Sequence, residues 1–293
     1  MADPFDRVGL VVHPSRVLRR ALATIDAWAA RTGTELVRLD GQGPGDAERA
    51  TSCDLVVAVG GDGTTLAALH AAAPARRPVL GVACGSLGAL TAVTADHLDD
   101  ALDRVAAGDV GLRALPALRV TGAVGEPQTA FNDLVLVRRG AGQVIVHVAV
   151  EGQRVVRFAG DGVVVATALG STGYTLAVGG PVLEPGGDDV VTTPLAPHGG
   201  CCPSVVTRAG RTLTVTLEPG YGGARVEIDG RPRATLEPPE PGTFEVAHEP
   251  DAGLLVALED GEPFWAGLRR RRIVIDSPRI LARDDREAAA TSP

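Results

Sequence analysis

The chain has 293 residues, of which 45% are hydrophobic and 22% are charged, proportions that are typical of a soluble globular protein. Its formal net charge of −8 argues against non-specific binding to nucleic acid or to an anionic membrane. No apolar run approaches the ~20 residues of a membrane span, and the N-terminus lacks the pattern of a signal peptide. The four cysteines form no spaced metal-binding pairs, so we expect reduced thiols and a cytoplasmic location.

Residues 1–115 alternate between strand-like and helix-like segments. Valine-rich apolar runs predict buried strands, and amphipathic segments predict helices, the first of them with Ser15 as its N-cap. This alternation is typical of an α/β domain in which helices cover both faces of an open, mostly parallel sheet. The strands are expected at residues 8–12, 35–39, 55–59 and 78–83, and the helices at about residues 16–30 and 95–107.

After about residue 115 the pattern changes to short strand-like runs separated by glycine turns. Glu151-Gly152-Gln153 and Asp229-Gly230-Arg231 have the composition of hairpin turns. We expect an all-β, sandwich-like domain over residues 116–262, with one short helix at about residues 171–177. The expected strands are residues 117–122, 133–138, 144–150, 154–158, 163–167, 205–206, 211–217, 225–228 and 243–247.

Two further segments complete the predicted domain organisation. Residues 263–275 pair apolar side chains with a run of four arginines, and we expect this segment to return to the first domain. Residues 276–293 are polar, and we expect them to form a disordered tail.

The glycine cluster Gly60-Gly61-Asp62-Gly63-Thr64 lies between a predicted strand and a predicted helix start. Backbone N–H groups at a helix N-terminus can face an anion, and glycines let a ligand approach closely. A carboxylate in such a loop would repel phosphate unless it binds a metal ion or accepts a proton from a hydroxyl group. Asp62 is therefore a candidate either for binding a metal ion or for accepting a proton from a hydroxyl group.

Three other stretches contain the same kinds of polar group. Asn132 stands beside Asp133 at the start of a predicted strand, Asp161 stands between two glycines, and residues 170–175 gather hydroxyl groups and a tyrosine in a glycine-framed turn. Free amides, hydroxyl groups and several carboxylates together indicate a site for a polyhydroxylated, phosphate-bearing ligand.

In their order along the chain, these motifs resemble the NAD kinase family. The resemblance continues into Gly179-Gly180-Pro181-Val182 and residues 193–198, and it covers roughly residues 8–273. The Gly-Gly-Asp-Gly-Thr loop alone marks a larger superfamily that includes diacylglycerol kinases and phosphofructokinases. The run at residues 161–181 is much more specific to NAD kinases.

The resemblance implies an α/β domain, a β-sandwich domain and a site between them. It implies transfer of the ATP γ-phosphoryl group to the 2′-hydroxyl of the adenosine half of NAD, with Mg²⁺ or another divalent cation required. It also implies a homodimer or homotetramer whose partners are small-molecule substrates. The implied site comprises Asp62 as base; Gly60, Gly61, Gly63 and Thr64 around phosphate; and Ala89, Leu90, Asn132, Asp133, Asp161, Thr172, Gly173, Tyr174 and His198 around the acceptor.

The chain departs from the family pattern mainly around the acceptor. Ala83 and Ala89 replace an asparagine and a pocket-lining phenylalanine, Asp133 replaces a glutamate, and Gly173 replaces an alanine. The usual Arg-Pro after Pro197-His198 is also missing. These changes leave open a kinase for another nucleoside, nucleotide, sugar or polyol, a donor such as polyphosphate, or a non-catalytic nucleotide-binding protein.

Overall fold

The computed structural model describes residues 5–14, 18–41, 45–200, 202–258 and 263–291. Ser15, predicted as a helix N-cap, lies outside these residues. The chain forms two compact units, Met1–Glu259 and Asp260–Pro293, and each is considered by itself.

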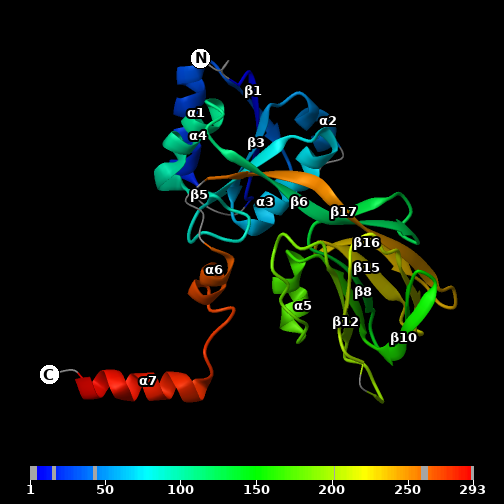
Figure 1. Ribbon diagram of the computed structural model, residues 1–293. Helices are drawn as coiled ribbons and strands as arrows, with labels where there is room; N and C mark the ends of the chain where they lie inside the picture. Colours follow the sequence, from blue (N-terminus) through cyan, green and yellow to red (C-terminus); the bar gives the residue numbers. More distant parts are fainter. Residues whose placement is uncertain (1–4, 15–17, 42–44, 201, 259–262, 292–293) are drawn as a thin grey trace. The chain divides into compact units, whose positions relative to one another are not determined.

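The N-terminal part of the first unit is an α/β layer structure (Figure 1). Its parallel strands are ordered β5-β4-β3-β1-β2, and the predicted bounds of β2 and β4 are reproduced. Helices α1 and α4 pack on one face of the sheet, whereas α2 and α3 pack on the other. The elements are β1 (Arg7–Val12), α1 (Arg19–Thr32), β2 (Glu35–Leu39), α2 (Asp46–Thr51), β3 (Leu55–Gly60), α3 (Asp62–Ala72), η1 (Ala73–Ala75), β4 (Pro78–Ala83), β5 (Val93–Thr94), η2 (Ala95–His97) and α4 (Leu98–Ala106).

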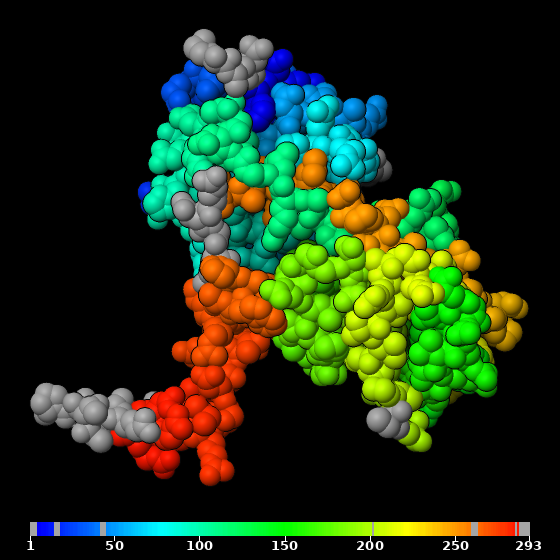
Figure 2. Space-filling model, viewed as in Figure 1, coloured from blue at the N-terminus to red at the C-terminus, as the bar shows by residue number. Residues whose placement is uncertain are grey.

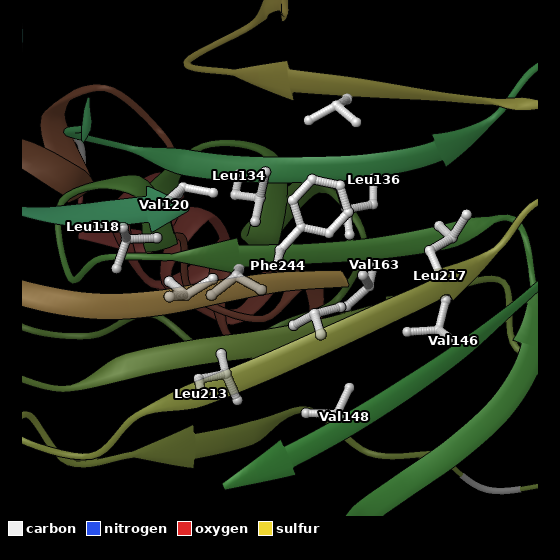
Figure 3. Close-up of a cluster of buried hydrophobic side chains, with 14 of the residues drawn as sticks. Leu118, Val120, Leu134, Leu136, Val146, Val148, Val163, Leu213, Leu217 and Phe244 are labelled. Carbon is white, nitrogen blue, oxygen red and sulfur yellow. The ribbon is translucent and has the colours of Figure 1, made fainter. Parts of the chain in front are cut away.

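The remainder of the first unit is mostly antiparallel. A six-stranded sheet, β13-β12-β11-β8-β15-β16, packs on β6, β9, β14 and β17 of the larger sheet through a core of leucine, valine and phenylalanine side chains (Figure 3). The predicted α/β and β-sandwich classes are therefore confirmed. The elements are β6 (Gly111–Gly122), β7 (Gln128–Ala130), β8 (Asp133–Arg138), β9 (Val144–Val150), β10 (Gln153–Gly160), β11 (Gly162–Ala166), η3 (Gly170–Thr172), α5 (Tyr174–Ala177), β12 (Val190–Leu195), β13 (Val205–Thr207), β14 (Leu213–Glu218), β15 (Ala224–Ile228), β16 (Arg231–Leu236) and β17 (Gly242–Ala257).

Two long strands, β6 and β17, join the α/β part to the β part. β17 pairs antiparallel with β14 in the sandwich, and its far end pairs parallel with β4 through Leu254 and Leu255. The eleven-stranded sheet is therefore continuous through both parts, and the orange atoms of β17 lie between the two lobes in Figure 2. β6 runs through residue 115, which we predicted as a domain boundary.

The second unit contains two helices, α6 (Phe264–Arg270) and α7 (Pro278–Thr291). α7 occupies the segment that we expected to be disordered. The Ser277 carbonyl accepts hydrogen bonds from the Ile280 and Leu281 amides in the first turn of α7. Proline at the first helical position, followed by a sequence rich in alanine and arginine, favours a helix although the segment is polar. Among the residues that the structure describes, no helix is long and apolar enough to cross a membrane.

Candidate active site

Asp62 is the first residue of α3 and follows Gly61, which caps the helix in an extended conformation. Its Oδ2 accepts a hydrogen bond from the Ala89 amide at 2.9 Å, and its Oδ1 accepts one from the Leu90 amide at 2.9 Å. A Cβ at Gly88 would lie only 2.0 Å from Oδ1. Because glycine has no side chain at this position, the loop at residues 88–90 can close around the carboxylate and fix its orientation.

Three of the four predicted phosphate-binding residues, Gly61, Gly63 and Thr64, line a pocket of about 360 Å³ beside Asp62. Asp62 and Gly63 begin α3, where backbone N–H groups lack an acceptor within the helix, so these two amides can face an anion. A Cβ at Gly61 or Gly63 would meet nothing within 4 Å, so the space over this turn is open. The pocket is lined by Val11, Val12, His13, Pro14, Asp40, Gly61, Asp62, Gly63, Thr64 and Ala67.

Gly60 and Thr64 pack closely against each other in this turn. A Cβ at Gly60 would lie 2.2 Å from the Thr64 Oγ1, so only glycine allows this contact. The Thr64 amide donates to the Gly61 carbonyl at 3.0 Å and tightens the first helical turn. The structure thus brings the predicted phosphate-binding residues together with the predicted base, and with Ala89 and Leu90.

A second group of predicted residues gathers around Asn132. The Asn132 carbonyl accepts the Thr167 amide at 2.9 Å, and a Cβ at Gly170 would lie 2.1 Å from the same carbonyl oxygen. This close packing places the η3–α5 turn, which contains Thr172, Gly173 and Tyr174, against the start of β8. Thr172 donates its hydroxyl to the Leu169 carbonyl at 3.2 Å, and Tyr174 is 40% exposed.

Asp133 is buried next to this turn, with 7% of its surface exposed. Burial, followed by the negative charges of Asp229 and Glu227, raises the pKa of the Asp133 carboxyl to about 7. This carboxyl group therefore holds its proton to a higher pH than an ordinary aspartate, and in its protonated form it can donate as well as accept a hydrogen bond.

Asp161 and His198 lie apart from the residues around Asn132. β11 pairs with β8 so that Ala166 lies opposite Asp133. Asp161 is five residues before Ala166. At ~3.4 Å per residue along a strand, Asp161 therefore lies ~17 Å from Asp133. Asp161 accepts a 2.6 Å hydrogen bond from the Arg138 Nε, and its amide donates to Leu195. His198 lies beside it, because the His198 amide donates to Ala159 at 2.8 Å.

Two site residues, Asp229 and His70, were not predicted. Asp229 was interpreted only as part of a hairpin turn, yet its carboxylate accepts the amides of Phe131, Asn132 and Asp133 at 2.7–3.0 Å. His70, on α3, lies 2.7 Å from the other side of this carboxylate. The only sequence signal was an aspartate in the turn, and an aspartate there is common for conformational reasons alone.

A further pocket of about 310 Å³ lies on the side of the sheet covered by α1. Its lining includes Leu18, the Arg20–Asp96 ion pair, Ala83 and Cys84. Ala83 replaces the family's asparagine, but no residue predicted for the site lines this pocket.

Comparison with known proteins identifies the family. The ATP-NAD kinase N-terminal domain profile matches residues 19–110, and the ATP-NAD kinase C-terminal domain profile matches residues 131–252. The chain is 36% identical to the NAD kinase of Natronomonas pharaonis, over 72% of this chain and 79% of that protein. It is also 36% identical to the NAD kinase of Symbiobacterium thermophilum, over 74% of this chain and 78% of that protein.

Solved structures show the same fold. Yeast NADH kinase complexed with NADH superimposes with a TM-score of 0.78 at 18% identity, covering 94% of this chain and 89% of that one. An NAD kinase from Archaeoglobus fulgidus in complex with ATP gives a TM-score of 0.73 at 24% identity, covering 92% of this chain and 100% of that one.

Proposed function

Because the chain belongs to the ATP-NAD kinase family, we propose that it transfers the γ-phosphoryl group of ATP to the 2′-hydroxyl of the adenosine half of NAD, giving NADP. The observation that supports this most directly is the position of Asp62. Its carboxylate is held in place by two backbone amides, and Asp62 is the first residue of a helix whose N-terminal amides can bind phosphate. Such a pairing suits phosphoryl transfer to a hydroxyl group.

In the proposed reaction Asp62 is the general base. The Ala89 and Leu90 amides each use one lone pair of the carboxylate, and each oxygen keeps another with which to accept the hydroxyl proton. The hydroxyl oxygen forms a bond to the γ-phosphorus as its proton moves to Asp62. The bond from the γ-phosphorus to the β–γ bridging oxygen breaks, and ADP leaves with that electron pair.

The triphosphate would occupy the pocket beside Asp62, facing the first amides of α3. A divalent cation bound with ATP would neutralise charge on the phosphates as the bond breaks. Within the described part of the chain, no group of three or more His, Cys, Asp or Glu side chains could hold a metal ion by itself. This fits Mg²⁺, which binds mainly to substrate phosphates with one or two carboxylates, and Asp62 and Asp40 line the pocket.

The acceptor would lie between Asp62 and the residues around Asn132. Asn132 and Thr172 offer hydrogen bonds to ribose or base, and the half-exposed ring of Tyr174 offers a stacking surface. Asp161 and His198 would contact the same acceptor only along its length or from a second copy of the chain, which would fit the homodimer or homotetramer implied by the family.

A substrate panel tests this function. The purified full-length chain, ATP and Mg²⁺ are incubated with NAD, NADH, nucleosides or sugars, and ADP and phosphorylated product are quantified. We expect ADP and NADP in equal amounts with NAD as acceptor. ADP formation with another acceptor, and none with NAD, would refute the assignment.

A further inference from the structure

The Asp229 carboxylate has four hydrogen-bonding contacts, with the amides of Phe131, Asn132 and Asp133 and with His70. Its side chain is fully buried. Oδ1 accepts the amides of Asn132 and Asp133 at 2.7 and 3.0 Å, and Oδ2 accepts the amide of Phe131 at 2.9 Å. A buried charge is unfavourable unless it is paired and hydrogen-bonded, so this arrangement ties Asp229 firmly to the backbone that begins β8. That backbone carries the proposed acceptor-binding residues.

His70 makes a further contact with the Asp229 carboxylate. Its Nε2 lies 2.7 Å from the Asp229 Oδ2, and its ring meets the Phe131 ring edge-on with centroids 5.4 Å apart. His70 belongs to α3, the helix whose first residue is Asp62. Because a helix is stiff over so few turns, the position of His70 constrains the position of Asp62.

The same turn makes a third connection. Arg231, two residues after Asp229, donates to the Gly41 carbonyl at 3.3 Å, and Gly41 follows Asp40, which lines the proposed phosphate pocket. The turn at Asp229-Gly230-Arg231 therefore contacts the phosphate side of the site at two points, His70 and Gly41, and it contacts the acceptor side through the backbone amides at the start of β8.

We propose that His70 and Asp229 are positioning residues for phosphoryl transfer, and that their contact fixes the acceptor-binding backbone at Asn132 and Asp133 relative to Asp62. This inference rests on the proposed function. Reacting atoms must approach within ~3–3.5 Å, and a displacement of ~1 Å can cost ~100-fold in rate. Neither residue faces the phosphate pocket, so both act through the groups that they hold.

Variants of His70 separate positioning from general stability. His70→Leu removes the bond to Asp229, His70→Gln keeps an N–H group at a similar reach, and His70→Asn keeps a polar group that is too short. The matched control is His147→Leu, which removes another histidine–carboxylate contact, to Glu218 at 2.5 Å. kcat, both KM values, ATP and NAD binding measured separately by calorimetry, and Tm are determined for each.

We expect His70→Leu and His70→Asn to lower kcat by ~10- to 100-fold, while ATP and NAD binding, each measured alone, change less than ~3-fold because each half of the site is intact. His70→Gln should recover most of kcat, and His147→Leu should retain it. If His70→Leu does not fold, the comparison of His70→Asn with His70→Gln decides the question.

The outcomes are distinguishable. A wild-type chain that forms no NADP overturns the proposed function together with the positioning role. An active wild-type chain with equal kcat in His70→Asn and His70→Gln overturns the positioning role alone. Losses of kcat that follow Tm in all four variants, including His147→Leu, also overturn it, because they indicate a purely structural role.

Discussion

Replacing Asp133 with asparagine should change how the stability of the protein depends on pH. Burial, followed by the charges of Asp229 and Glu227, raises the pKa of Asp133 from 3.8 to about 7 in the folded chain. The folded state therefore holds a proton that the unfolded state releases between these two pH values. Where the folded state binds more protons than the unfolded state, the free energy of unfolding falls as pH rises.

The magnitude follows from the two pKa values. A difference of one pKa unit corresponds to ~1.36 kcal/mol, so the change from 3.8 to about 7 corresponds to ~4 kcal/mol over the full range. Between pH 5 and pH 8, where the protein is most easily measured, the contribution of Asp133 falls by ~3 kcal/mol. Asparagine does not titrate, so Asp133→Asn should lack this fall.

Urea unfolding of both proteins at pH 5, 6, 7 and 8 tests this prediction. The free energy of unfolding of the variant, relative to wild type, should rise by ~3 kcal/mol from pH 5 to pH 8. Asp103→Asn is the control: hydrogen bonding from Arg31 lowers the pKa of Asp103, so its contribution is lost only at more acidic pH. A difference between Asp133→Asn and wild type that is constant across this range would refute the reasoning.

Three further outcomes follow from the site. Asp62→Asn should lower kcat by ~10²- to 10⁴-fold with ATP binding largely retained, and calorimetry with steady-state kinetics checks both; retained turnover would exclude Asp62 as the base. Ala89→Phe should lower the KM for NAD by ~2- to 10-fold through aromatic stacking without changing the KM for ATP, and an unchanged KM for NAD would place Ala89 outside the acceptor site. Chelation of divalent cations with EDTA should abolish turnover, which Mg²⁺ should restore; activity that persists in EDTA would contradict the proposed role of the cation.

β3 and β4 could be predicted from the sequence because they are apolar runs, whereas β2 is an edge strand that carries Glu35 and Arg38. β2 and β4 were predicted with the bounds that they have in the structure. β12 was not among the predicted strands; it contains Pro194, and proline normally argues against a strand within a sheet. β13 pairs only with Val190, Val191 and Thr192 of β12, so Pro194 lies beyond the two-sided part of the ladder and its missing N–H is tolerated.

The site was predictable only where its residues are close in sequence or belong to a recognised motif. The glycine loop with Asp62 is such a motif, and four of its five residues, Gly61 to Thr64, line one pocket. His70 and Asp229 are 159 positions apart in the sequence, and a contact between residues so far apart cannot be predicted from a local sequence pattern. Conversely, the sequence motifs placed Asp161 in one site with Asn132, yet Asp161 lies at the other end of the paired strands β8 and β11.

The hydrogen bonds around Asp62 explain why this chain can differ from its family at Ala89 and keep its base in place. Ala89 and Leu90 hold the carboxylate through their backbone amides, so the side chain at position 89 is free to vary. Gly88 is not free, because any side chain there would collide with the Asp62 carboxylate. Substitution at Ala89 should therefore leave Asp62, the proposed base, in place, whereas Gly88→Ala would displace Asp62 itself.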